Sequence, residues 1–329
     1  MILHSQFTPA SGLSNAHLQT LLPILLRKNL KFKGVKQRLE LDDGDFLDLV
    51  WTEKPANNAA QKNKPIVIVF HGLEGSIHSP YAKGMMLAIK ARGWIGLLMH
   101  FRGCSEFDNR LARTYHSGET ADAKQLLNWL KKHYANANLA AVGFSLGGNM
   151  LLKLQAELAE ASPFNAVVSV CAPLQLDACA TRLNSGFSKI YQMYLLFYLK
   201  QKLRTKSTQH DYKKLINFDV NNVHKIKNFW TFDDKVTAPL HGFLGADDYY
   251  KQCSSRQYLK NIKNPSLILL ALDDPFMLPE IIPEEAELSA TTQLELSLTG
   301  GHVGFINGTV LKPKYWLEER VPEFLSEFI

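Results

Sequence analysis

The sequence predicts an α/β fold in which a mostly parallel sheet of eight strands carries helices on both faces. Short apolar runs such as PIVIVF (65–70) are typical of strands that are buried on both faces. These runs alternate with stretches of helical periodicity, which is the pattern of parallel sheets covered by helices. The length of 329 residues and the 46% hydrophobic content suit a sizeable core. We therefore expect residues 1–329 to form a single domain.

The N-terminal half supplies an arm, a hairpin and the first parallel strands. Residues 1–35 contain several prolines and are expected to wrap the core as an N-terminal arm. Apolar and polar residues then alternate on both sides of an Asp-Gly-Asp turn, which predicts an antiparallel hairpin, and a polar loop follows at 55–65. The predicted strands of this half are 37–43, 45–52, 65–70 and 94–101, and the predicted helices are 81–94 and 119–134.

The C-terminal half continues the alternation around one insertion. Between about 175 and 235, after the sixth predicted strand, the sequence is helix-like and rich in aromatic residues. We expect this segment to lie over the carboxyl edge of the sheet as a helical lid, with its aromatic residues either packed inside or facing a membrane. The predicted strands of this half are 137–144, 164–173, 266–274 and 293–301, and the predicted helices are 146–160 and 313–329.

The net charge of +6 limits the choice of partners. Much of the basic excess lies in residues 28–37 and 200–206, which are either solvated helix ends and loops or a surface that attracts anionic lipids or acidic substrates. A transient contact with a membrane surface is therefore one expectation. Nucleic-acid binding is not expected because no recognised motif accompanies the charge. The oligomeric state cannot be predicted from this pattern.

The compartment is predicted from three absences in the sequence. No window has the 18 or so apolar residues that a membrane-spanning helix needs. The N-terminal segment lacks the basic region of a signal peptide, and the four cysteines are too few and too widely spaced for a disulfide framework. The simplest interpretation is a cytoplasmic protein. No metal-ligand spacing and no phosphate-binding glycine loop are found, so neither a metal nor a cofactor is predicted.

The sequence GFSLG places Ser145 between Gly143 and Gly147, after a predicted strand and before a predicted helix. The glycines either loosen a surface turn or allow a sharp strand-to-helix turn that exposes the serine oxygen as a nucleophile. In the second case the helix N-terminus favours the negative charge that develops beside the serine. The choice depends on whether partners of a nucleophilic serine are present.

Two backbone amides are candidates for an oxyanion hole. One is the amide of Leu146, which follows the serine, and the other is the amide of Leu73 in HGLEGS (71–76), directly after the strand 65–70. A simple glycine turn is the alternative for this loop. His71 is expected to be a structural loop histidine.

The remaining partners of a nucleophilic serine are a base and an acid that follow it in the chain. Of the eleven histidines, only His302 lies beyond the last predicted strand, whereas His241 is expected to be structural or to line a pocket. Two acids, Asp273 and Asp274, end the preceding strand, and the following proline favours Asp274. An aspartate there would orient the histidine and stabilise its charged form. We therefore expect Ser145 to be a nucleophile, Asp274 the acid and His302 the base.

Several motifs over nearly the whole chain resemble the YheT-like family of α/β-hydrolases, which includes bacterial hydrolases and eukaryotic esterases, phospholipases and medium-chain acyltransferases. The resemblance implies an α/β-hydrolase fold, a triad of Ser145, Asp274 and His302, and carboxylesterase-type activity. Glu74 departs from many eukaryotic relatives and would have to face away from an oxyanion site. The motifs are NAHLQTLLP (15–23), HGLEGS (71–76), HFRGCSE (100–106), RTYHSGET (113–120), VGFSLGGNM (142–150), FDDKVTAPLHGF (232–243) with DDYY (247–250), ALDDPF (271–276) and GGHVGF (300–305).

The predicted function is hydrolysis of small-molecule esters with short-to-medium acyl groups through an acyl-enzyme on Ser145, without a cofactor. Transfer of the acyl group to an alcohol and a non-catalytic binding module are the alternatives. Around the site, Arg102 and Asp122 are expected to pair and fix loops. Tyr249 and Tyr250 are expected to line the acyl pocket or to pack in the core.

Overall fold

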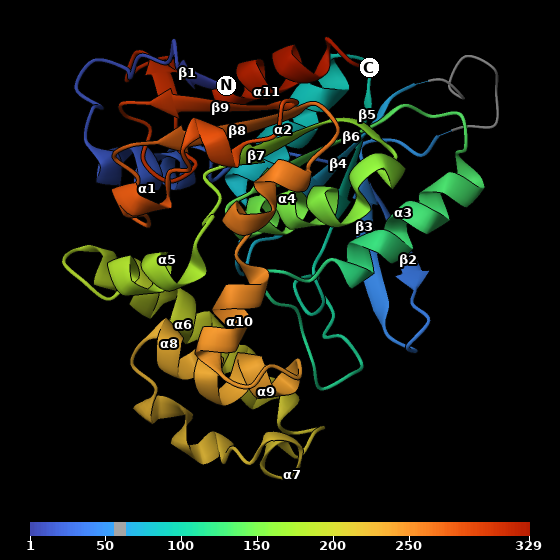
Figure 1. Ribbon diagram of the computed structural model, residues 1–329, viewed down its shortest axis with the longest axis vertical. Helices are drawn as coiled ribbons and strands as arrows, with labels where there is room; N and C mark the ends of the chain where they lie inside the picture. The colour runs from blue at the N-terminus through green and yellow to red at the C-terminus, as the bar shows by residue number, and fades with distance from the viewer. Residues whose placement is uncertain (56–63) are drawn as a thin grey trace.

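The computed structural model describes residues 1–55 and 64–329, so most of the predicted polar loop at 55–65 lies outside the described residues (Figure 1). Its centre is a sheet with the strand order β1-β9-β8-β7-β6-β4-β5-β3-β2. The strands are β1 (Ile2–His4), β2 (Val35–Glu40), β3 (Phe46–Trp51), β4 (Ile66–Phe70), β5 (Ile95–Met99), β6 (Leu139–Phe144), β7 (Phe164–Val170), β8 (Ser266–Ala271) and β9 (Thr292–Ser297).

The sheet has nine strands within the described residues, so the prediction of eight was one too low. The additional strand, β1, lies inside the predicted N-terminal arm and pairs in parallel with β9, Ile2 lying opposite Leu294. Three residues at a sheet edge are too few to show a recognisable period in the sequence. The strands β2 and β3 form the predicted antiparallel hairpin, β3 also pairs antiparallel with β5, and every other neighbouring pair in this sheet is parallel.

Helices cover both faces of the sheet, as predicted (Figure 1). The α-helices are α1 (Ala16–Leu26), α2 (Pro80–Ala91), α3 (Ala121–His133), α4 (Leu146–Leu158), α5 (Leu176–Leu183), α6 (Ser188–Lys206), α7 (Tyr212–Ile216), α8 (Phe229–Phe232), α9 (Ala238–Leu240), α10 (Ala246–Cys253) and α11 (Leu317–Leu325). A π-helical turn, η3, spans Asp233–Thr237, and short 3-10 turns lie at η1 (Ala159–Ala161), η2 (Val220–Lys225), η4 (Arg256–Asn261), η5 (Pro279–Ile281) and η6 (Glu285–Glu287). No helix of the described residues is long and apolar enough to cross a membrane.

The two cores follow from the alternation of side chains along the strands. In β4, Val67 and Val69 face a core that includes residues of α2 and α11. Ile66 and Ile68 face the opposite core, which includes residues of α3. Because both faces are covered, every residue of β4 is buried, and this explains the uninterrupted apolar run in the sequence.

The helical insertion lies between β7, which is the sixth predicted strand, and β8 (Figure 1). It begins with α5 as expected, but its helices continue beyond residue 235 to the end of α10. The insertion has its own apolar core, which includes Tyr191, Leu203, Tyr212 and Phe232. It therefore packs as a helical layer beside the carboxyl ends of the strands.

The end of the chain differs from the prediction of one helix over 313–329. Residues Pro313–Tyr315 form a strand, β11, that pairs antiparallel with β10 (Ile306–Gly308). Only Leu317–Leu325 form the closing helix α11. The positive φ of Gly308, at 77°, permits the tight turn that starts this small hairpin.

Candidate active site

Ser145 occupies a sharp turn between β6 and α4. Its backbone has a φ of 51° and a ψ of −119°, a conformation that is costly for a residue with a side chain. Both flanking glycines are required by close backbone contacts. A Cβ on Gly143 would lie 2.4 Å from the carbonyl oxygen of Gly147, and a Cβ on Gly147 would lie 2.5 Å from that of His71. The glycines of GFSLG therefore serve a packed, strained turn and not a loose surface loop.

The structure brings the predicted base and acid to this serine. The Nε2 atom of His302 lies 2.9 Å from Oγ of Ser145, and its Nδ1 atom lies 2.8 Å from Oδ2 of Asp274. His302 follows β9 and Asp274 follows β8, so residues after the carboxyl ends of the parallel strands β6, β8 and β9 converge here. The ring of Phe276 stacks on the imidazole at a centroid distance of 3.9 Å. This arrangement can remove the serine proton and hold the resulting imidazolium.

The two adjacent aspartates have different partners. Asp274 faces His302, and its second oxygen, Oδ1, accepts a hydrogen bond of 2.8 Å from the amide of Phe276. Asp273 instead accepts a hydrogen bond of 2.9 Å from the amide of Gly301, and its Oδ2 atom is buried with no partner among the described residues. Burial raises the pKa of Asp273. The structure therefore places Asp274 beside His302, whereas Asp273 binds the loop that carries the histidine.

The loop that contains Leu73 approaches the serine closely, because a Cβ on Gly72 would lie 3.3 Å from that of Ser145. Within the described part of the chain, no hydrogen bond from the amides of Leu73 and Leu146 to a protein acceptor is found. Both residues line the same cavity as Ser145. Two amides at this position are available to an oxyanion.

Glu74, which the sequence required to face away from an oxyanion, is held by two partners. Its Oε1 atom accepts hydrogen bonds from Nζ of Lys202, at 2.6 Å, and from the hydroxyl of Tyr115, at 2.8 Å. The amide of Glu74 donates to the same tyrosine oxygen at 2.8 Å, and the residue has a positive φ of 53°. The carboxylate is thus neutralised by a lysine of α6. Sequence reasoning missed Lys202 because it lies 128 residues from Glu74.

A cavity of about 140 Å³ opens at the serine and extends between the sheet and the insertion. Most of its lining is apolar, and most of the lining residues come from the helical insertion, from α5 to α10. Tyr249 and Tyr250 line the cavity, which was one of the two roles expected for them. Both side chains are also buried, and their hydroxyl groups donate to Ser117 and Asp233, respectively. Other lining residues are Leu176, Leu183, Leu195, Leu199, Leu203, Phe229, Phe232, Val236, Leu240 and Phe276.

Two groups of side chains bring together donor atoms of the kind that bind metal ions. Among the described residues, one consists of Cys171, Asp274 and His302, and the other consists of His116, Glu119 and His241, of which the two histidines line the cavity. Burial lowers the pKa of His116 to about 3 and that of His241 to about 2, so both rings are neutral, as metal ligands must be. However, Arg113 already donates to Glu119 at 2.9 Å, which leaves little negative charge to attract a cation. The sequence did not indicate this cluster because His241 is far from the other two residues.

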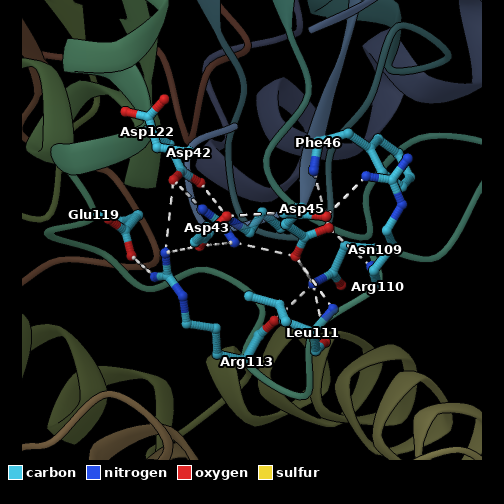
Figure 2. A network of polar contacts seen from close by, with 12 residues as sticks. Asp42, Asp43, Asp45, Phe46, Asn109, Arg110, Leu111, Arg113, Glu119 and Asp122 are labelled. Atoms are coloured by element: carbon cyan, nitrogen blue, oxygen red, sulfur yellow. Dashed lines mark hydrogen bonds and ion pairs between the residues drawn. The ribbon is translucent and has the colours of Figure 1, made fainter. Parts of the chain in front are cut away.

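Arg102 is buried and forms ion pairs with Asp43, Asp45 and Asp122. Figure 2 shows the polar network to which these three aspartates belong. Arg102 binds Asp122 as predicted, through hydrogen bonds of 2.7 and 2.6 Å, and also Asp43 and Asp45 of the turn between β2 and β3. Burial tends to raise the pKa of Asp43, but hydrogen bonds from Arg102 and Arg113 lower it to about 2. The network therefore fixes the loop that carries Tyr115 and His116 to the cavity.

A serine on a strained strand-to-helix turn, with a histidine and an aspartate delivered by later strands, is the arrangement of the α/β-hydrolases. The α/β-hydrolase fold family matches residues 65–309 of the chain. "Putative esterase YheT" of Escherichia coli (strain K12) is 47% identical over 325 residues, which cover 99% of this chain and 94% of that protein. The chain therefore belongs to the α/β-hydrolases and, within them, to the YheT-like family.

More distant relatives agree with this assignment. "Phospholipase ABHD3" of Bos taurus is 27% identical, and the match covers 94% of this chain and 76% of that protein. Among solved structures, the Pyrococcus furiosus esterase Pf2001 superimposes with a TM-score of 0.58 at 18% identity, covering 92% of this chain and 93% of the esterase. That likeness supports the fold alone.

Proposed function

We propose that the protein is a carboxylesterase that cleaves small-molecule esters with short-to-medium acyl groups through an acyl-enzyme on Ser145. The observation that carries the proposal is the continuous series of hydrogen bonds from Ser145 through His302 to Asp274 at the mouth of an apolar cavity. The names of the relatives, an esterase and a phospholipase, support ester bonds as the target. The apolar lining supports an acyl chain as the group that enters the cavity.

In the proposed mechanism, His302 takes the proton of Ser145 as the serine oxygen attacks the ester carbonyl carbon. The amides of Leu73 and Leu146 stabilise the tetrahedral oxyanion, with each donor contributing about 3–4 kcal/mol to the transition state. His302 then donates the proton to the leaving alcohol oxygen as the carbon–oxygen bond breaks. Water, deprotonated by the same histidine, attacks the acyl-enzyme and releases the acid and the free serine. No cofactor takes part in these steps.

The helices α5–α10 act in this proposal as a lid that provides the acyl pocket. Residues of α6 and α8 line the cavity, and α6 also contacts the oxyanion loop through Lys202 and Glu74. We propose that the whole chain functions as one domain. The four cysteines are free and buried, which fits a reducing compartment, so the cytoplasm stays the predicted location.

Acyl transfer to an alcohol is a second candidate. The apolar lining and the Phe276 ring stacked on His302 favour it, because they restrict the access of water to the acyl-enzyme. Incubation of an acyl ester with added ethanol, followed by analysis of products, distinguishes the two reactions. A predominant ethyl ester would indicate transfer, and a predominant free acid would indicate hydrolysis.

The decisive experiment is labelling of the purified protein with a fluorophosphonate probe, which reacts with activated serines. We expect the wild type and a Ser326→Ala control to be labelled and the Ser145→Ala variant to remain unlabelled. A His302→Ala variant should label far more slowly, because the serine has lost its base. A wild type that resists labelling under all conditions would contradict the proposal and favour a binding module.

A further inference from the structure

Helix α6 exposes an apolar, largely aromatic face on the side opposite the cavity. Its outward side chains repeat at helical spacing, and three of them, Met193, Tyr194 and Phe197, are 60%, 61% and 59% exposed. Large apolar side chains in such a group are rare on soluble surfaces unless the group binds something. We call this surface the α6 face; it consists of Lys189, Ile190, Met193, Tyr194, Phe197, Tyr198 and Arg204, all of which are exposed.

The N-terminal end of α1 adjoins the start of α6. The ring of His17 lies 4.3 Å from that of Phe187, and its Nδ1 atom lies 3.0 Å from the hydroxyl oxygen of Tyr191. From this junction, Leu18, Leu21 and further residues of α1 are also exposed. Two neighbouring helices therefore present apolar side chains to solvent.

The two sequence segments that contain these helices carry charge of a single sign. Residues 1–39 and 178–210 contain no aspartate or glutamate, although the whole chain has 31 such residues. On α6, the exposed Lys189 and Arg204 lie at the two ends of the apolar face. Beyond α1, the exposed Lys28 and Lys31 add positive charge. A surface of this kind attracts a partner that is both negatively charged and apolar beneath its charged layer.

We propose that the α6 face docks on the surface of an anionic lipid bilayer. Aromatic and aliphatic side chains flanked by lysine and arginine are the composition that binds at the boundary between headgroups and acyl chains. A second copy of this chain is a poorer occupant, because a symmetric contact through the α6 face would bring like charges together. The occupant that complements both the charge and the apolar area is the anionic membrane surface.

Docking in this way would place the cavity next to the lipid. The opposite side of α6, with Leu195, Leu199 and Leu203, lines the cavity. The buried Tyr191 contacts Phe276, whose ring stacks on His302. This consequence, that ester substrates enter from the membrane, rests on the proposed function, whereas docking itself does not require catalysis.

Sedimentation of the full-length protein with vesicles tests the proposal. We expect binding to vesicles of phosphatidylcholine with phosphatidylglycerol, weaker binding to phosphatidylcholine alone, and loss of binding to the anionic vesicles at high salt. A Phe197→Glu variant should bind the anionic vesicles at least about tenfold less. The matched control is Phe107→Glu, because Phe107 is 58% exposed on a loop beside β2 and should bind as the wild type does.

Two further measurements keep the result interpretable. Thermal unfolding must show that Phe197→Glu is folded, and a Lys189→Ala/Arg204→Ala variant should reduce binding although every aromatic side chain of the α6 face is kept. Ser145→Ala should bind vesicles as the wild type does, so the sedimentation assay measures docking independently of catalysis. Absence of wild-type binding to either vesicle, or unchanged binding by Phe197→Glu, would overturn the proposal. So would a wild-type dimer that Phe197→Glu converts to monomers, because it would identify a second copy as the occupant.

Discussion

Replacement of Lys202 by methionine should uncouple the helical insertion from the oxyanion loop. The side chains of Glu74 and Lys202 are only 11% and 13% exposed, and their polar atoms are 2.6 Å apart. Lys202→Met keeps most of the apolar volume but leaves the Glu74 carboxylate with the hydroxyl of Tyr115 as its side-chain partner among the described residues. Removal of one partner from a buried pair costs about 3–5 kcal/mol. Because the tyrosine hydroxyl still donates to the carboxylate, we expect a loss at the lower end of this range, about 3 kcal/mol, in the free energy of unfolding.

The same substitution should reduce turnover of the proposed reaction. Glu74 follows Leu73 directly and has a positive φ, so a shift of its carboxylate moves the adjacent amide. Loss of one well-aimed oxyanion donor costs a factor of about 10² to 10³ in kcat, and a displaced donor should cost about 10 to 100. The assay is hydrolysis of p-nitrophenyl esters, with kcat and KM measured separately and urea unfolding measured in parallel. We expect the loss mainly in kcat.

The control for this prediction is Lys200→Met on the same helix, where Nζ binds the carbonyl oxygen of Ile226 and no carboxylate. The double variant Glu74→Gln/Lys202→Met removes both charges and should recover much of the lost stability. Wild-type kcat in a folded Lys202→Met variant would refute the idea that the lysine positions the oxyanion loop.

Three further predictions concern the turn, the acid and the pH dependence. Gly147→Ala should destabilise the fold by at least about 3 kcal/mol and abolish fluorophosphonate labelling, because its Cβ would lie 2.5 Å from the carbonyl oxygen of His71. A stable variant that is still labelled would show that the turn tolerates a side chain at this position. Asp274→Asn should lower kcat by about 10⁴-fold, because the asparagine cannot hold His302 in the required tautomer. In Asp273→Asn the side-chain oxygen still accepts from the amide of Gly301, so its kcat should stay within about tenfold of the wild type. Equal losses in the two variants would argue against Asp274 as the orienting acid. Burial lowers the pKa of His241 to about 2 and keeps the ring neutral in the folded protein, whereas the unfolded chain binds a proton below about pH 6.5. Stability should therefore fall as the pH drops from 7 to 5. Urea unfolding of His241→Gln should show this fall reduced by about 2 kcal/mol.

The local parts of the fold could be predicted from the sequence because they depend on neighbouring residues. Within the described residues, apolar runs and helical periods located eight of the nine strands of the main sheet and the helices α2, α3 and α4. They missed α1, which lies in the predicted N-terminal arm, and located α11 only in part. The elbow around Ser145 was also evident, since the glycines, the strand and the helix that make it are consecutive. The order of serine, aspartate and histidine along the chain nominated His302 and the pair Asp273 and Asp274, and the proline that follows favoured Asp274.

Only the tertiary structure decided which distant groups meet. Asp273 and Asp274 are adjacent in sequence, and the path of the chain after β8 turns one toward His302 and the other toward Gly301. The strand β1 forms because its three residues pair with the edge of β9. Lys202 contacts Glu74 because α6 packs against the oxyanion loop. Sequence patterns report the local preferences of a segment, whereas contacts between remote segments depend on how the whole chain packs. For that reason the sequence by itself determined the chemistry available to this protein, and the tertiary structure decided its geometry.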